Sequence, residues 1–498
     1  MNRKFYLRLP ALLIAVFAVV GCASQAETAV STEAPKQDTA PVTEAVTEPA
    51  AVREQPNLPE NLDFGGHTFT IMNNEHSLPM WTQYGVGTDD MNGESLNDAI
   101  YSRNKTVEDQ YNCTIVSYQT LDLGGELSKL VKAGDSTMDL TTPHLRTFAS
   151  QAAGGLYIDL HTVESLDLSR PWYDQNSVAE VSIMNRLFGA ATDITLMDKQ
   201  ATGALVFNKG IYSDYDLDST FGDIYSIVRD GKWTFEMMSA MATSVSSDLN
   251  GDGIMTDADL YGLLYQRDTL TSFFTAFDIN LATKNADDIP EMTLASDRNF
   301  TVTEHIFDLI YREDYCMHVM KYFGEQDYTD KMVEMFQGDR ALMMWIRLRD
   351  VEDLRSMEAD FGILPMPKYE ESDNSYRSAV NSYVGTMTCI PQTNYDPDMT
   401  GYFIEALASE SHYTVIPEYY NINLQGKISR DEESREMLDL IFSNRHYDLG
   451  EIYDPGNFAN TLIFMTMDGK RDIASLWAKQ EKSVTRNLEK LLEKFGDL

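Results

Sequence analysis

Hydrophobic and polar positions along the first part of the chain predict an α/β unit. Residues 67–73 (HTFTIMN) are β-branched and aromatic with partial alternation, which is typical of a strand. Residues 94–112 place their apolar side chains on one face of a helix. A second strand is expected at 113–119, a second helix at 124–134 and a third strand at 138–143. This order predicts a parallel sheet with helices on its faces.

The same kind of pattern returns after residue 200. Strands are expected at 203–210 (GALVFNKG), 260–266 (LYGLLYQ), 341–346 (ALMMWI) and 360–367 (DFGILPMP). A helix that follows Thr234 as its N-cap is expected after the first of these strands. Two α/β units in one chain predict an α/β protein of two lobes around a cleft, and such a cleft is a common place for a small-molecule site.

The amino terminus has the pattern of an export signal. Arg3, Lys4 and Arg8 precede the apolar run 11–20, which is too short for a permanent membrane span. Gly21 and Cys22 follow, and they resemble a bacterial lipobox. Residues 1–21 are therefore expected to be a lipoprotein signal peptide with Cys22 as the lipidation site. The alternative is an ordinary signal peptide with an incidental cysteine.

The segment after Cys22 predicts a tether. Residues 22–60 are rich in Ala, Thr, Glu and Pro and contain no aromatic residue, so they cannot bury enough apolar surface to offset the entropy of ordering. No later apolar run reaches the ~20 residues of a transmembrane helix. The chain is therefore expected to contact the membrane through its lipid anchor only.

Charge and motif content narrow the classes of function. The 498 residues carry a formal net charge of -39, which disfavours a nucleic-acid partner because phosphate binding needs a basic face. The eight histidines form no metal-binding pair, and there is no GxSxG or P-loop motif. Cys113, Cys316 and Cys389 are too few and too widely spaced for a disulfide framework. They are expected to be buried apolar residues, although one disulfide among them stays open.

Residues 248–259 (DLNGDGIMTDAD) have the spacing of a twelve-position calcium loop, with Gly253 at the sharp turn. The candidate ligands are Asp248, Asn250, Asp252, Ile254 through its carbonyl, Thr256 and Asp259. A helix enters the loop and a strand leaves it, so a bound Ca²⁺ would have a structural role rather than that of a sensor. The alternative is an acidic turn without metal.

Polar and aromatic residues near the expected strand ends are candidate ligand contacts. In open α/β sheets ligands collect at the carboxyl ends of strands. Aromatic rings can stack on a flat ligand face, and planar polar groups can form paired hydrogen bonds. For Trp172, core packing is an equal alternative. These criteria select Trp81, Thr142, His144, Arg146, Trp172, Tyr173, Asp174, Gln266 and Arg267.

The order of segments along the whole chain resembles the family-1 extracellular solute-binding proteins, the substrate receptors of ABC importers for carbohydrates. Those proteins are distantly similar to maltose-binding protein, and the lipoprotein form occurs in Gram-positive bacteria. The segments that carry the resemblance include LNDAIYSRNKTVEDQYNCTI, DLTTPHLRTFASQAAGGLYIDL, PWYDQN, LVFNKGIY, GKWTFEMM, FQGDRALMMW, DFGILPMPKY and IPEYYNINLQGKISRDEESREMLDLI.

The resemblance implies a two-lobe, periplasmic-binding-protein-like (type II) fold with a ligand cleft between the lobes. The first lobe would comprise 61–200 and 384–427, and the second 201–383 and 428–498. It also implies ligand contacts from Trp345 and, near the second crossing of the chain, from Asn381 and Tyr383.

The function expected from this resemblance is that of a lipid-anchored receptor on the extracellular face of the cell membrane. It would be a monomer without catalysis, it would bind a sugar, and it would deliver that sugar to ABC permease subunits. The alternative is a surface-anchored carbohydrate-active enzyme or an adhesin.

Overall fold

Three parallel strands form the first sheet, as the sequence predicts. Its order is β2-β1-β3, with β1 (His67–Asn74) paired in parallel to β2 (Cys113–Thr120) and to β3 (Leu140–Thr142). The computed structural model describes residues 53–498 except 77–85, 89 and 425–431. The helices that follow the strands are α1 (Ser95–Tyr111), α2 (Leu123–Ala133) and α3 (Leu145–Ala152).

Local sequence sets where these helices begin and end. The Asp122 carboxylate accepts a hydrogen bond from the Gly125 N–H at the start of α2, and Gly134 ends that helix in the left-handed region at φ 68. Helix α9 (Phe235–Val245) begins after Thr234, whose side chain accepts from the Met237 N–H. The predicted N-cap at Thr234 is therefore confirmed.

The second sheet is mixed. Its order is β10-β4-β9-β5-β8. Strand β4 runs antiparallel to β10 and β9, whereas β5 runs parallel to β9 and β8. Every residue of β4, β5 and β9 is buried, so no alternation in the sequence could reveal the strand directions. The bounds are β4 (Gly203–Asn208), β5 (Tyr261–Tyr265), β8 (Cys316–His318), β9 (Ala341–Arg347) and β10 (Phe361–Leu364).

Helices cover both faces of this second sheet. Along β4, Leu205 and Phe207 belong to one hydrophobic core cluster, while Ala204 and Val206 belong to another. The helices between the strands are α6 (Lys209–Asp214), α7 (Leu217–Phe221), α8 (Ile224–Arg229), α9, α10 (Thr269–Ala276), α11 (Asp297–Ile310) and α12 (Val319–Gln337). A short hairpin of β6 (Ala282–Lys284) and β7 (Pro290–Met292) follows α10.

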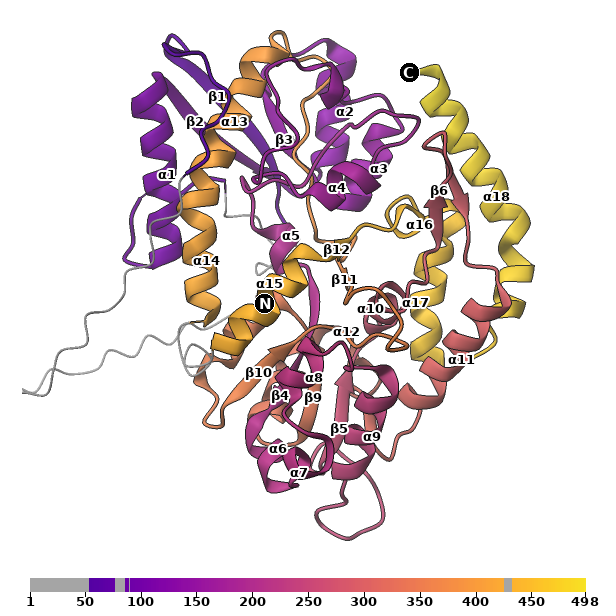
Figure 1. Cartoon of the computed structure of the whole chain (residues 1–498). Helices are drawn as coiled ribbons and strands as arrows, with labels where there is room; N and C mark the ends of the chain where they lie inside the picture. Colours follow the sequence, from indigo (N-terminus) through magenta and orange to yellow (C-terminus); the bar gives the residue numbers. More distant parts are fainter. Residues whose placement is uncertain (1–52, 77–85, 89, 425–431) are drawn as a thin grey trace, which may run out of the picture. The chain divides into compact units, whose positions relative to one another are not determined.

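Two lobes result, each built on one sheet with its own core. The first-lobe core joins Phe69 and Ile71 of β1 to Phe403 and Leu407 of α13 (Pro397–Tyr413), a segment far away in the sequence. Figure 1 shows α13 and α14 (Val415–Leu424) beside α1, in agreement with the contacts between these helices. Helix α15 (Glu432–Ser443) packs instead on β10 of the second lobe.

The carboxyl-terminal part differs from the expected lobe assignment. We expected 428–498 to pack on the second lobe, but Tyr447, Leu449 and Ile452 of the segment containing α16 (Leu449–Ile452) lie in the first-lobe core. Helix α17 (Phe458–Asp468) returns to the second core. Helix α18 (Ile473–Asp497) places Trp477 in the second core and Phe495 in the first. A single long amphipathic helix can contact both cores because it spans ~1.5 Å per residue.

Residues 53–60 are the last of the predicted tether and lie against the first lobe. The Tyr413 hydroxyl accepts a hydrogen bond of 2.7 Å from the Glu54 N–H, and Leu58 packs on the first-lobe core. The tether therefore ends earlier than residue 60, because Leu58 offers apolar surface to bury. The signal peptide, Cys22 and the rest of the tether lie outside the described residues.

Two further expectations concern cysteines and membrane spans. Cys113, Cys316 and Cys389 are buried and unpaired, which confirms that they are apolar core residues. In the described part of the chain, no helix is long and apolar enough to cross a membrane.

Candidate functional site

Arg146 joins the first lobe to segments that return from the second. It lies in the first turn of α3, just after the carboxyl end of β3. Its Nε donates to Ser382 Oγ over 3.1 Å, and its Nη1 donates to Asp454 Oδ2 over 2.9 Å. The guanidinium also lies over the Tyr383 ring, 4.1 Å from its centroid. The loop selected from the sequence therefore meets the predicted second crossing.

Asn381 and Tyr383 extend this contact to the second lobe. The Tyr383 hydroxyl donates to Asn460 Oδ1 of α17 over 2.6 Å. The Asn381 amide donates to Asp268 Oδ2 over 3.1 Å, and Asp268 precedes α10 at the carboxyl end of β5. We call Arg146, Asp268, Asn381, Tyr383 and Asp454 the junction cluster. It brings together groups from both lobes and from the crossing between them.

Further predicted residues border this cluster on the second lobe. Arg267 places its Nε 3.4 Å from Asp268 Oδ1, and its guanidinium lies 4.7 Å from the centroid of the Phe464 ring. Gln266 is 1% exposed, and its Oε1 accepts from the Asp268 N–H. Among the described residues, Gln266 Nε2 has no hydrogen-bond partner.

Arg347 lies near Asp268 in the second lobe, and no sequence motif indicated it. It ends β9, two residues after Trp345, and its Nε donates to Asp350 Oδ2 over 3.1 Å. Burial acts to lower the pKa of Arg347, but the charges of Asp350, Tyr328 and Asp268 outweigh burial and raise it. The guanidinium therefore stays charged although only 5% of the residue is exposed.

Glu451, on α16, lies behind the crossing. It accepts a hydrogen bond of 2.9 Å from Ser382 Oγ, the same hydroxyl that Arg146 contacts. Burial raises the pKa of Glu451 to about 7, against the opposing effect of Arg146. No sequence motif indicates Glu451, Asp454 or Asn460. Asp454 begins an Asp-Pro-Gly turn, and such turns occur in many loops without a functional role.

A hollow of about 710 Å³ opens beside Arg146 at the carboxyl edge of the first sheet. This volume lies within the range of ~300–1,000 Å³ that is usual for small-molecule sites. Hydroxyl, amide, carboxylate and cationic groups line it, and among the described lining residues there is no aromatic ring. The polar lining comprises Asn74, Asp122, Ser128, Lys132, Arg146, Thr147, Ser150 and Gln151.

Thr142 and His144 support this edge from within. Thr142 Oγ1 donates to Asn73 Oδ1 over 2.6 Å, and the His144 N–H donates to Asn74 Oδ1 over 2.8 Å. Burial lowers the pKa of His144 to about 3, and the nearby His76 adds to the effect. The His144 imidazole is therefore neutral at physiological pH, and no described residue hydrogen-bonds its Nε2.

Three of the predicted aromatic contacts, Trp172, Tyr173 and Trp345, are core residues. Trp172 has no exposed surface and its indole N–H donates to Glu405 Oε2 over 3.2 Å, while the Tyr173 hydroxyl donates to Glu405 Oε1 over 2.6 Å. Trp345 is 3% exposed and donates to Ser272 Oγ over 2.9 Å. None of the three presents a free ring face, which favours the packing interpretation of Trp172. Asp174 pairs with Arg445 away from the junction cluster. Trp81 lies outside the described residues.

The predicted calcium loop connects α9 to β5, which approach closely: a Cβ on Gly262 would lie 2.1 Å from the Ala242 carbonyl oxygen. Asp248 accepts from the Gly251 and Gly253 N–H groups, and Asp259 accepts from the Leu249 and Thr256 N–H groups. These contacts hold the loop as a tight turn. In the part of the chain that is described, no group of three or more His, Cys, Asp or Glu is placed to hold a metal ion.

The remaining predicted oxygens of the loop have similar roles. Asn250 Oδ1 accepts from the Asp252 N–H, and Asp252 Oδ1 accepts from the Ile254 N–H, both over 2.8 Å. Thr256 Oγ1 donates to Asp259 Oδ2 over 3.1 Å. The carboxylate and amide oxygens of the loop therefore accept hydrogen bonds from backbone N–H groups of the turn. Ca²⁺ binding stays a prediction.

Comparison with known proteins identifies the fold. No protein-family model and no curated protein matches the chain. Among solved structures, an ABC substrate-binding protein from Listeria monocytogenes in complex with cycloalternan is 12% identical, with a TM-score of 0.52, and 86% of this chain aligns with 99% of that one. A cyclo/maltodextrin-binding protein complexed with maltotetraose is 13% identical, with a TM-score of 0.54 and coverage of 86% and 96%. A sugar transporter from Rhizobium etli, in an open conformation, is 12% identical, with a TM-score of 0.55 and coverage of 86% and 99%.

The chain therefore has the two-lobe α/β fold of these sugar-binding solute-binding proteins, which confirms the fold predicted from the sequence.

The raised pKa of Glu451 makes a prediction about stability and pH. Its folded-state pKa of about 7 exceeds the ordinary value of 4.5, so the proton stabilises the folded protein below pH 4.5 and this contribution is lost as the pH rises through 7. The loss is on the order of 3 kcal/mol. Glu451→Gln should therefore have a higher melting temperature than wild type at pH 8.5 and nearly the same one at pH 5.

The measurement is thermal unfolding across this pH range. Glu481→Gln, on the exposed side of α18, is the matched control and should follow wild type at every pH. Equal melting temperatures for wild type and Glu451→Gln at pH 8.5 would contradict the assignment.

Proposed function

We propose that this protein is a sugar receptor of an ABC importer that captures an oligosaccharide between its two lobes. The observation that carries the proposal is the junction cluster. It joins Arg146 of the first lobe, Asn381 and Tyr383 of the crossing and Asp268 of the second lobe in one chain of polar contacts.

The chemistry of the cluster suits a neutral, hydroxyl-rich ligand. Guanidinium, carboxylate and amide groups are planar donors and acceptors that can bind adjacent hydroxyls in pairs. The one arginine of the cluster, Arg146, pairs with Asp454, and the neighbouring Arg267 and Arg347 pair with Asp268 and Asp350. The cluster therefore presents many hydrogen-bonding groups without a large net charge, which favours a sugar over an anionic ligand.

The fold supports the same proposal. The similar structures include binding proteins with bound cycloalternan and maltotetraose. In our proposal a sugar contacts both lobes at once and so favours the arrangement in which they are closed. A ligand can shift such an equilibrium only by binding one arrangement more tightly than the other. No bond is made or broken in the sugar.

Direct binding tests this function. A panel of monosaccharides, linear maltooligosaccharides, cyclic glucans, cello- and xylo-oligosaccharides is titrated by calorimetry, and a parallel assay looks for hydrolysis products. We expect saturable binding of at least one oligosaccharide without product. Asp268→Asn should weaken that binding tenfold or more, because a hydrogen bond to a charged group contributes ~1.5–3 kcal/mol.

Asp268→Asn should not destabilise the start of α10, because the Asp268 side chain makes no capping hydrogen bond. Asp287→Asn, in the exposed loop between β6 and β7, is the matched control and should bind like wild type. Product formation would favour the carbohydrate-active enzyme instead, and no binding to any sugar would refute the receptor.

We also propose that the protein is held by lipid on Cys22 at the extracellular face of the cell membrane and acts there with permease subunits. The support is the apolar run 11–20, followed by Gly21, Cys22 and a Pro-, Thr- and Glu-rich segment. Cys22→Ser should move the protein from the membrane fraction to the soluble fraction, as measured by fractionation and immunoblotting. An unchanged distribution would contradict the lipid anchor.

Calcium in the loop 248–259 is a separate proposal. The support is the spacing of oxygen-bearing residues on a turn that joins α9 to β5. With millimolar Ca²⁺ and a dissociation constant of ~10⁻⁴ M, the stabilisation amounts to ~1.4 kcal/mol. EDTA should lower the melting temperature by about 2–4 °C and leave sugar affinity at lower temperature unchanged.

Excess CaCl₂ should restore the melting temperature, and Asp252→Asn should abolish the response to EDTA. A wild-type melting temperature that does not respond to EDTA would show that the loop is a metal-free turn.

A further inference from the structure

Three segments of the chain meet where the two lobes join. The first leads from α5 (Met197–Gln200) into β4, the second contains β11 (Ser378–Ala379), and the third contains β12 (Arg445–His446). Thr202 forms an antiparallel bridge with Val380, and β11 pairs in parallel with β12. The Asn381 N–H donates to the Ala201 carbonyl over 3.1 Å. The three segments thus form a small ladder of their own.

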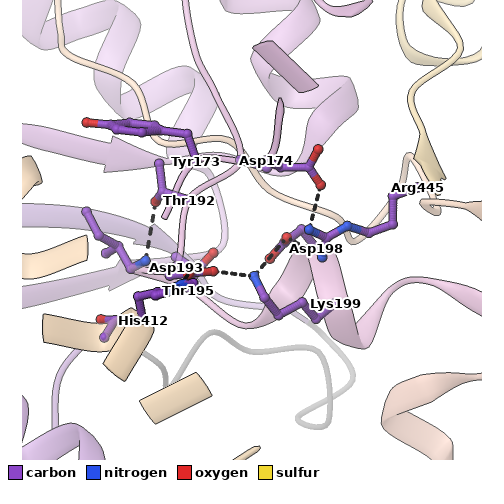
Figure 2. Close-up of polar contacts among 12 residues, drawn as sticks. Tyr173, Asp174, Thr192, Asp193, Thr195, Asp198, Lys199, His412 and Arg445 are labelled. Carbon is purple, nitrogen blue, oxygen red and sulfur yellow. Dashed lines mark hydrogen bonds and ion pairs between the residues drawn. The ribbon is translucent and has the colours of Figure 1, made fainter. Parts of the chain in front are cut away.

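Buried charges connect the first and the third of these segments. Arg445 of β12 makes two ion pairs, with its Nη2 2.6 Å from Asp174 Oδ2 and its Nη1 2.9 Å from Asp198 Oδ2. Figure 2 shows this guanidinium between the two carboxylates. Asp198 lies in α5 at the first segment, whereas Asp174 begins α4 (Gln175–Glu180) in the first lobe and accepts from the Ser177 N–H. One side chain therefore ties the third segment to the first.

The network continues on the other side of α5. Lys199 Nζ lies 3.2 Å from Asp198 Oδ2 and 2.7 Å from Asp193 Oδ1. His412 Nδ1, at the end of α13, lies 2.6 Å from Asp193 Oδ2 (Figure 2). Burial alone would raise the pKa of Asp193, yet Lys199 and His412 hold it below its ordinary value.

These ions are deeply buried. The Arg445, Asp174 and Asp198 side chains are 8%, 5% and 1% exposed. A buried ion pair offsets its desolvation only when its geometry is good, and removing one partner leaves an uncompensated charge. Three carboxylates (Asp174, Asp193 and Asp198) share two permanent cations, so the loss of Arg445 would leave Asp174 and Asp198 facing each other with Lys199 alone. The arrangement is therefore sensitive to small movements of β12.

The network and the junction cluster share one piece of backbone. Ala379 pairs with His446, the residue after Arg445, and Asn381 follows Val380 of the bridge to Thr202. Asn381 and Tyr383 are the members of the junction cluster on that segment. No residue of the network belongs to the junction cluster, but β12 and two residues of that cluster are connected through the backbone of β11.

We propose that Arg445 is a positioning residue that sets the balance between the open and closed lobe arrangements by clamping Asp174 and Asp198. This inference rests on the proposed receptor function, since it assigns a regulator to the same site. The planar guanidinium suits the role because it presents separate N–H groups to two carboxylates at once. A lysine in its place would reach one carboxylate as a point charge.

The test compares Arg445→Met, Arg445→Lys and wild type as full chains. The first readout is small-angle X-ray scattering of the ligand-free protein, which reports lobe separation without any sugar. The second is stopped-flow fluorescence with the sugar found by calorimetry. Arg445→Met should change the ligand-free scattering profile and raise the dissociation rate constant at least tenfold, with less than a threefold change in the association rate constant.

Arg445→Lys should fall between wild type and Arg445→Met in both readouts. Arg312→Met, which removes an exposed ion pair with Asp314, is the control and should match wild type. A purely structural role would lower the melting temperature of Arg445→Met without changing scattering or the rate constants at a temperature where the variant is folded, and that result would overturn the proposal.

Two further experiments separate failure of the Arg445 proposal from failure of folding or of the receptor function. If Arg445→Met does not fold, Asp198→Asn replaces it, because this variant keeps the Arg445–Asp174 ion pair and should show a weaker effect of the same sign. If wild type binds no sugar, the receptor function fails, and scattering alone decides the role of Arg445. A profile of Arg445→Met identical to wild type would then refute it.

Discussion

The guanidinium of Arg445 lies between the carboxylates of Asp174 and Asp198 at the place where the chain passes from one lobe to the other. Each group would be costly to bury alone, so the three must be brought together as the lobes assemble. Their pairing holds β12 beside α5, and β12 pairs through its backbone with β11, the segment that leads to Asn381 and Tyr383 of the candidate site. In our proposal the relative placement of the sheets depends on these few buried charges as well as on the hydrophobic cores of the two lobes.

The candidate site also contains few cations, and each of its arginines is paired with a carboxylate. The chain has 39 Lys and Arg against 78 Asp and Glu, yet Arg146, Arg347 and Arg445 are placed at or near the lobe junction, each with an acidic partner. An acidic surface leaves the interior pairs unaffected, because burial and short distance strengthen them relative to screened surface charges. The result is a polar junction of low net charge, suited to recognising hydroxyl groups by hydrogen bonds.

The aromatic residues show why local composition is a weak guide to a ligand site. Trp172 and Tyr173 stand among polar residues in the sequence, as stacking residues of a sugar site often do, but both bind the buried carboxylate of Glu405. Glu405 lies on α13 and is more than two hundred residues away along the chain. The indole N–H and the phenol hydroxyl both find their hydrogen-bond acceptor, Glu405, inside the core. Nothing in the segment around Trp172 and Tyr173 could reveal that acceptor.

Local patterns along the chain predicted the helices and strands and indicated the class of fold. The period of hydrophobic positions, the Thr234 cap and the strand runs of both lobes depend on local chemistry. The strand ends indicated Arg146 and Arg267, and the family resemblance indicated Asn381 and Tyr383. In the structure the Arg146 guanidinium lies over the Tyr383 ring. Contacts between distant segments set the mixed directions of the second sheet, the return of Tyr447 to the first core and the partners of Glu451, Asp454 and Arg445. These features arise from pairings between residues distant in the chain, and the energy of a buried charge or hydrogen bond depends on its partner rather than on its own segment.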